Sequence, residues 1–288
     1  MWLLLAFLSM TLLGFYDVFK KMSLNGNDVV TVLFLNTLFC ALIFLPALLS
    51  CPFAWHDQLF IVLKSIIVLS SWLLGYIGIK HLPITIVGPI NATRPVMVLM
   101  GALLLFGERL NLCQWIGVLL AMFSFFLLSK SGKREGIDFR HNKWIACVVL
   151  SAVIGAGSGL YDKFIMAPPS EGGIGLDRTA VQSWNNLYQS LLMGLVWLAT
   201  HSRTRAKFHW HWAIVGISLF ISAADFAYFY ALSLNDAMIS IVSMVRRGSV
   251  IVSFIFGAMA FRERNLRAKA IDLALVLVGM IFLYLGSR

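Results

Sequence analysis

The chain has 288 residues, of which 60% are apolar and only 12% are charged. This charged share is about half of what soluble globular domains carry, and a soluble fold has too little polar surface to cover so many apolar side chains. The mean hydropathy of +0.85 agrees with this. These values exclude a soluble globular protein and predict an all-α integral membrane protein with the lipid bilayer as a partner.

The formal net charge of +10 does not indicate a nucleic-acid partner. The basic residues separate apolar stretches and do not gather on one face, which is typical of the short loops of a multi-pass membrane protein. The four cysteines lie far apart without a CxxC pair, so we expect neither a disulfide framework nor a zinc site. We expect no cofactor and no metal. The alternating histidines of residues 209–212 favour interfacial tryptophans over metal ligands.

Ten stretches are long and apolar enough to cross a bilayer, which takes about 20 residues. The first lacks a basic segment before it, so we expect a retained span and no cleaved signal peptide. The ten predicted transmembrane helices cover residues 2–20, 29–49, 59–79, 83–106, 111–129, 144–166, 179–200, 211–232, 236–260 and 268–286.

The sequence also repeats itself. Residues 106–109 (FGER) recur as residues 261–264 (FRER), and residues 84–87 (ITIV) recur at the same offset as residues 239–242 (ISIV). Near the start of each half, Trp2, Ser9 and Tyr16-Asp17 match Trp144, Ser151 and Tyr161-Asp162. We therefore divide the chain into a first five-helix repeat (1–129), a charged connection (130–143) and a second five-helix repeat (144–288).

An odd number of spans in each repeat places the two copies in opposite orientations, which is the inverted repeat of secondary transporters. The connections after odd-numbered spans hold fourteen Lys and Arg residues, whereas the even-numbered ones hold only Arg109 and Arg178. By the positive-inside rule, both termini are expected outside. We expect a multi-pass protein of the bacterial inner (plasma) membrane.

This pattern resembles the EamA family of the drug/metabolite transporter superfamily. The matching segments are residues 103–109 followed by 114–117, and residues 257–264 followed by 269–271. The resemblance implies ten helices in two repeats and secondary transport of small metabolites, often efflux. Residues 245–253 (VRRGSVIVS) also look like the ninth span of plastid phosphate translocators, which implies a cavity role for Arg246 and Arg247. Those relatives carry a lysine where this chain has Asn91.

Three arginines lie near mid-depth of the predicted fourth and ninth spans: Arg94, Arg246 and Arg247. Charged groups inside a bilayer are costly, so they are candidate functional residues. The guanidinium group suits carboxylate or phosphate. Adjacent helical residues point in different directions, so we expect one of Arg246 and Arg247 to bind ligand and the other to pair internally. The competing interpretation is that all three are structural.

Asp225, in the eighth span, is a candidate counter-ion of Arg246 or Arg247, and the alternative is a proton-coupling carboxylate. Candidate gating residues lie near the ends of the first and sixth spans, and simple interfacial anchoring is the alternative for them. They are Tyr16, Asp17, Lys20, Tyr161, Asp162 and Lys163.

Polar and aromatic side chains inside spans are candidates for cavity lining, although plain packing competes for each aromatic residue. Besides Asn91, the candidate substrate-binding residues are Trp72, Tyr76, Trp184, Asn185, Tyr188, Gln189 and Tyr228. Pro89 and Pro95 can kink the fourth span. Glu108-Arg109 and Glu263-Arg264 are expected to fix hairpin turns at span ends.

The sequence therefore favours a secondary-active transporter that works by alternating access on an anionic metabolite: an organic acid, an amino acid or a phosphorylated compound. A permease for neutral or cationic compounds, with structural arginines, is the first alternative. A channel or an intramembrane enzyme is more remote, because the chain carries no HExxH or GxSxG motif. The expected partners are a small-molecule substrate and either protons or a counter-substrate, and the protein is expected to be a monomer or a homodimer.

Overall fold

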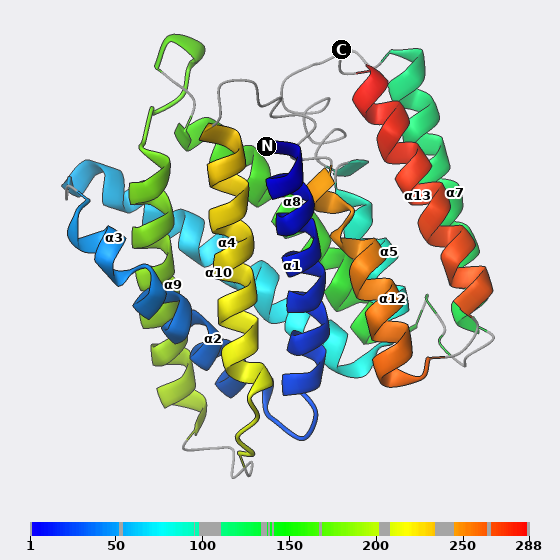
Figure 1. Ribbon diagram of the computed structural model, residues 1–288, viewed down its shortest axis with the longest axis horizontal. Helices are drawn as coiled ribbons and strands as arrows, with labels where there is room; N and C mark the ends of the chain where they lie inside the picture. The colour runs from blue at the N-terminus through cyan, green and yellow to red at the C-terminus, as the bar shows by residue number, and fades with distance from the viewer. Residues whose placement is uncertain are drawn as a thin grey trace.

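The computed structural model describes residues 2–51, 54–94, 96–97, 111–133, 137, 139, 141–166, 169–201, 208–233, 245–263 and 266–286. These residues are helical with short connections and contain no strand (Figure 1). The helices are α1 (Trp2–Ser23), α2 (Val29–Ile43), α3 (Leu45–Leu49), α4 (Trp55–His81), α5 (Ile84–Ala92), α7 (Leu112–Lys133), α8 (Lys143–Met166), α9 (Arg178–His201), α10 (Ala213–Ser233), α12 (Ser249–Phe261) and α13 (Leu266–Gly286), with a 3₁₀ turn at Pro169–Glu171.

The exterior of the bundle is apolar, and the interior holds polar side chains. Helices α1, α4, α8 and α13 are long and apolar enough to cross a membrane, and α2, α7 and α10 contain shorter apolar stretches. Leu4, Leu49, Leu59 and Phe226 are 71–81% exposed, whereas the side chains of Asn36, Ser65, Thr85 and Lys269 are fully buried. This distribution suits a hydrocarbon surrounding and marks an integral membrane protein. That ten helices cross the membrane stays a prediction.

The predicted second span, residues 29–49, is two helices. Asp28 caps α2, accepting hydrogen bonds from the backbone N–H groups of Val30 at 3.0 Å and Thr31 at 3.3 Å. The helix stops at Phe44, and Pro46 lies in the first turn of α3. Proline lacks an N–H group and suits a first helical turn, so the chain restarts there and does not continue straight.

The fourth and ninth predicted spans are described only in part. Helix α5 passes through Pro89 without interruption and ends at Ala92. Residues 98–106 and 236–244, and with them the repeat match at 239–242, lie outside the described residues, as do Pro95, Glu108-Arg109 and Arg264.

Helix packing in the bundle is reciprocal between the two predicted repeats. α1, the first predicted span, packs on α10, the eighth, and α4, the third, packs on α8, the sixth. Each span of one predicted repeat corresponds to the span five places on in the other. By this correspondence the α1–α12 contact matches the α5–α8 contact, and the α4–α9 contact matches the α2–α10 contact. α7 and α13, the last spans of the two halves, pair with each other at one side of the bundle (Figure 1). Both chain ends lie at one end of the bundle in Figure 1.

Two hydrogen bonds at helix crossings are also equivalent under the exchange of the two predicted repeats. Ser65 of α4 donates to Asn185 Oδ1 of α9 at 3.0 Å, and Ser218 of α10 donates to Asn36 Oδ1 of α2, also at 3.0 Å. Each serine therefore satisfies a buried amide oxygen in the other predicted repeat.

The serines matched by the sequence repeat also have matching partners. Ser9 Oγ donates to the backbone oxygen of Ala224 in α10, and Ser151 Oγ donates to that of Ser71 in α4, both at 2.7 Å. Small hydroxyl side chains allow close helix approach and bond across it, as is common in membrane bundles.

Glu263, at the end of α12, caps the start of α5. Its Oε1 accepts from the Ile84 N–H at 2.7 Å and its Oε2 from the Thr85 N–H at 3.1 Å. Lys21 Nζ of α1 lies 3.3 Å from Oε1, and Lys269 Nζ of α13 donates to Thr85 Oγ1 at 2.9 Å. The expectation that Glu263 fixes its own hairpin turn is therefore corrected: its side chain joins the two halves of the chain, because the positive end of α5 attracts a carboxylate.

Helices α7 and α13 touch backbone to backbone. A Cβ atom added to Gly117 would lie 2.7 Å from Gly279 O, and one added to Gly279 would lie 3.0 Å from Gly117 O. Only glycine permits this approach, as in other small-residue crossings of membrane helices.

Gly117→Val is expected to push α7 and α13 apart and to lower the thermal midpoint of the protein in detergent. Overpacking of this kind costs about 1–3 kcal/mol. The control is Gly157→Val, because an added Cβ at Gly157 meets no atom within 4 Å. Equal midpoints for the two variants would contradict the backbone contact.

Glu263→Ala is expected to destabilise the protein by about 3–5 kcal/mol, because it removes the carboxylate that pairs with Lys21 and leaves two helix N–H groups without their acceptor. Glu263→Gln keeps an amide oxygen and is expected to lose less. Unfolding of both variants in detergent measures the difference. A Gln variant as unstable as the Ala variant would show that the charge alone matters and not the cap.

Candidate functional site

Two adjoining cavities lie in the interior of the bundle, one of 460 Å³ and one of 210 Å³. We call the larger the charged lobe and the smaller the amide lobe. Both are lined by helices of both predicted repeats. The residues common to the two linings are Ser71, Trp72, Arg94, Asp162 and Ile221, so the lobes meet at Arg94.

The charged lobe holds the three predicted arginines. Its lining also includes the predicted residues Asn91, Trp72, Tyr228, Tyr16, Asp17, Lys20 and Asp162. The described segment 245–248 carries Arg246 and Arg247 into the cavity from one end of α12.

Arg246 and Arg247 have different surroundings. Arg246 forms an ion pair with Asp225 of α10, and its guanidinium carbon lies 4.4 Å from the centre of the Tyr228 ring. Arg247 is exposed to the cavity. Asp225 thus neutralises one arginine and leaves the other available.

Arg94 lies against α8, where Gly155 leaves room for it. A Cβ atom on Gly155 would lie 3.0 Å from Arg94 Cζ. The Arg94 Nε atom is buried and has no hydrogen-bond partner among the described residues. In the same part of the chain no carboxylate lies within 4.0 Å of the Arg94 or Arg247 nitrogens. Neither arginine therefore has a carboxylate in direct contact, although Asp17 of the same cavity acts electrostatically on Arg94.

At the other end of the charged lobe, Lys20 lies over aromatic rings. Its Nζ is 4.3 Å from the centre of the Tyr76 ring and 5.4 Å from that of Tyr16. Tyr76 is fully buried behind this wall, where its hydroxyl accepts a hydrogen bond from Asn36 Nδ2 at 3.1 Å. Such cation–π contacts stabilise an ammonium group that has left water.

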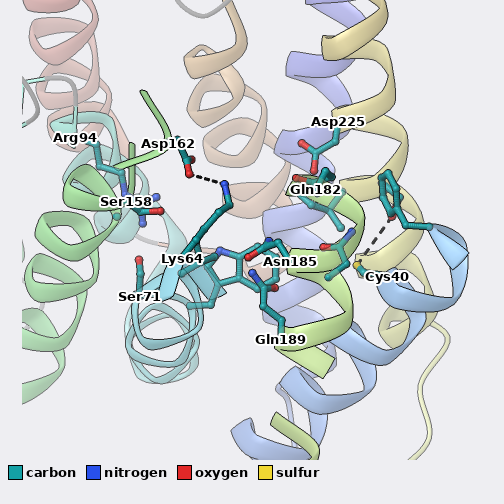
Figure 2. Close-up of a pocket in the computed structure, with 17 residues that line it drawn as sticks. Cys40, Lys64, Ser71, Arg94, Ser158, Asp162, Gln182, Asn185, Gln189 and Asp225 are labelled. Carbon is teal, nitrogen blue, oxygen red and sulfur yellow. Dashed lines mark hydrogen bonds and ion pairs between the residues drawn. The ribbon is translucent and has the colours of Figure 1, made fainter. Parts of the chain in front are cut away.

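The amide lobe is lined by carboxamide and hydroxyl groups, with Lys64 and Asp162 forming an ion pair across α4 and α8. Figure 2 shows Lys64 and Asp162 facing each other, Arg94 and Ser158 on one side, and Gln182, Asn185 and Gln189 on the other. The ion-pair partner of the gating candidate Asp162 is Lys64. The side chain of Lys163 lies outside the described part.

Four predicted site residues do not line either cavity: Tyr76, Trp184, Tyr188 and Tyr161. Trp184 and Tyr188 stack with their ring centres 5.9 Å apart, and Tyr188 donates to Gln58 Oε1 at 2.8 Å. Tyr161 donates to the Phe60 backbone oxygen at 3.2 Å. These aromatic residues pack α8 and α9 against α4, so packing, the competing interpretation, describes their contacts.

Sequence reasoning missed several lining residues, chiefly Lys64, Gln182, Asn186 and Ser158. The signal for Lys64 was present, because it is a charged residue within a predicted span. The signal for the amides was their spacing along α9, where Gln182, Asn185, Asn186 and Gln189 fall on one helical face.

The histidines of residues 209–212 have structural contacts. The His209 backbone N–H donates to Asn27 Oδ1 at 2.8 Å, and His211 Nδ1 accepts from the Ala213 N–H at 3.1 Å at the start of α10. The second contact satisfies a free N–H group of the first helical turn.

Comparisons with known proteins agree with this architecture. Twenty-two chains of solved structures match the chain. One, titled only as the crystal structure of a protein, is 14% identical with a TM-score of 0.63, and the alignment covers 100% of this chain and 98% of the other. That likeness shows a shared fold. None of the curated proteins matches the sequence. The family model described as the EamA-like transporter family matches residues 1–130. This match confirms the resemblance seen in the sequence and assigns residues 1–130 to the EamA-like transporter family, within the drug/metabolite transporter superfamily.

Proposed function

We propose that the protein is a secondary-active transporter of small anionic metabolites. The observation that carries this proposal is the pair Arg94 and Arg247, which line an internal cavity and have no carboxylate of the described residues within 4.0 Å of their nitrogens. Arginine stays charged and offers a planar set of donors to a carboxylate or phosphate. A bound anion would supply the missing counter-charge, and the cavity is large enough for a small metabolite.

We propose that transport follows an alternating-access mechanism based on two inverted repeats. The reciprocal helix pairs and the matched bonds Ser65–Asn185 and Ser218–Asn36 support this arrangement. Since the cavity is lined from both halves, rocking of one half against the other would change the end at which it opens. The Lys64–Asp162 pair and the Glu263 cap connect the halves and would have to rearrange.

The state described here would be open toward the less basic end. Beyond Lys20 and Tyr16, the buried side chains of Leu24, Ile79 and Leu82 fill the bundle toward the turn that follows α1. Glu263, with its partners Lys21 and the Ile84 N–H, lies at that same end, where α1 finishes and α5 begins. By the positive-inside rule this basic end faces the cytoplasm, so the cavity would face outward.

A permease for neutral or cationic compounds is the second candidate. Asp17 lines the charged lobe and Asp225 shows that an arginine can be neutralised within the chain. If Arg94 served only to balance Asp17 through the cavity, the substrate would need no negative charge. An enzyme is less favoured, because the matched family is one of transporters.

Arg94→Ala and Arg247→Ala are each expected to raise the half-saturating concentration for anion counterflow in proteoliposomes by about tenfold or more. The reason is that hydrogen bonds to charged groups contribute about 1.5–3 kcal/mol. Arg178→Ala is the matched control, because Arg178 is exposed and outside both cavity linings. Exchange restricted to neutral or cationic solutes, and insensitive to Arg94 and Arg247, would favour the second candidate.

Lys64→Ala and Asp162→Ala are each expected to slow transport and lower thermal stability, because each leaves a charge unpaired inside the bundle. The double variant is expected to recover part of both losses. Thermal midpoints of the wild type, the two single variants and the double variant give the coupling energy between Lys64 and Asp162, which for contacting residues is about 0.5–3 kcal/mol. Strictly additive losses would show that the ion pair contributes nothing to either property.

A further inference from the structure

The amide lobe has an unusual lining for the interior of a membrane protein. Gln182, Asn185, Asn186 and Gln189 are spaced so that all four fall on one face of α9, and all four line this cavity. Membrane helices normally place apolar residues at such positions, because an amide that leaves water needs new hydrogen-bond partners. A stripe of four amides therefore requires partners within the cavity.

The chain itself supplies only some of these partners. Asn185 Oδ1 accepts from Ser65 at 3.0 Å. Asn186 is 4% exposed, and its Nδ2 atom has no hydrogen-bond partner among the described residues. Leaving a buried amide donor without an acceptor is costly, so this atom needs an oxygen that the described part of the chain does not provide.

The charges of the amide lobe are balanced within the protein, apart from Arg94. Lys64 pairs with Asp162, and Asp225 pairs with Arg246. The lobe thus presents neutral donors and acceptors, whereas the charged lobe presents Arg94 and Arg247. Since Arg94 lines both, one ligand can place its charged end at Arg94 and its body in the amide lobe.

We propose that the amide lobe is a subsite for an uncharged, oxygen-rich body of the transported anion, one that carries several hydroxyl or carbonyl groups. This inference rests on the proposed function and narrows its substrate class to polyhydroxylated or carbonyl-rich anions. Asn186 Nδ2 donates to an oxygen of that body, and the neighbouring amides supply both donors and acceptors. The volume of 210 Å³ equals that of about seven liquid water molecules, which suits a small polyol chain.

Three probes separate the two lobes: gluconate, a six-carbon carboxylate with hydroxyl groups; hexanoate, a six-carbon carboxylate with an apolar body; and glucitol, the neutral polyol. Binding to the full-length protein in detergent is followed by tryptophan fluorescence, since Trp72 lines both lobes. The wild-type protein is expected to bind gluconate at least about tenfold more tightly than hexanoate, and glucitol weakly.

Asn186→Leu is expected to weaken gluconate binding about tenfold, the equivalent of one lost hydrogen bond, and to leave hexanoate binding unchanged. Gln182→Leu, at a half-buried position of the same stripe, gives a second measurement if Asn186→Leu fails to fold. Asn25→Leu is the matched control, because Asn25 is an exposed amide outside both cavities. Arg247→Ala is expected to weaken the binding of gluconate and of hexanoate by the same factor.

The outcomes distinguish this inference from the proposed function. Hexanoate binding equal to or tighter than gluconate binding, or an amide substitution that affects both carboxylates equally, would overturn the subsite and leave the anion site standing. Binding of glucitol in preference to both carboxylates, unaffected by Arg247→Ala, would overturn the proposed anion transport. A preference for gluconate over hexanoate that only the amide substitutions remove would support both the subsite and the proposed anion transport.

Discussion

The need to compensate charged side chains that leave water organises much of this structure. Lys64 has a carboxylate, Lys269 has the Thr85 hydroxyl, and Arg246 has both a carboxylate and an aromatic ring. Most of these contacts cross between helices, so the same bonds that neutralise charges also set the helix arrangement. Arg94 and Arg247 stand apart because no carboxylate of the described residues lies within 4.0 Å of their nitrogens, and both line the cavity.

Hydropathy predicted the positions of the helices well, because a bilayer demands apolar stretches of a set length and each predicted span overlaps a described helix. It did not predict where a helix is interrupted. The break at Phe44 is followed by Pro46 in the first turn of α3, whereas Pro89 leaves α5 intact. Proline alone therefore does not locate a break, since the surrounding helices decide whether the lost hydrogen bond is replaced.

The arginines of the site could be predicted because charge inside an apolar span is a strong signal. Trp184 and Tyr188 could not, because they occupy a face of α9 that packs on α4 and not the face that meets the cavity. The predicted Trp72 and Tyr228 do line it. Which face of an amphipathic membrane helix meets the cavity depends on its neighbours. Lys64 could have been predicted by the same rule, because it is a charged residue inside an apolar span. Its pairing with Asp162 could not, because Asp162 lies 98 residues away in the sequence.

The contact between Gly117 and Gly279 has a consequence for how the bundle can change shape. Where backbones touch, the contact itself has no side-chain rotamer that can switch to an alternative packing, although the Leu283 side chain lies beside it. Helices α7 and α13 thus form a unit with a single preferred geometry, and neither glycine lines the cavity. Any rearrangement around the cavity would leave this pair as a fixed reference, against which the displacement of the other helices can be measured.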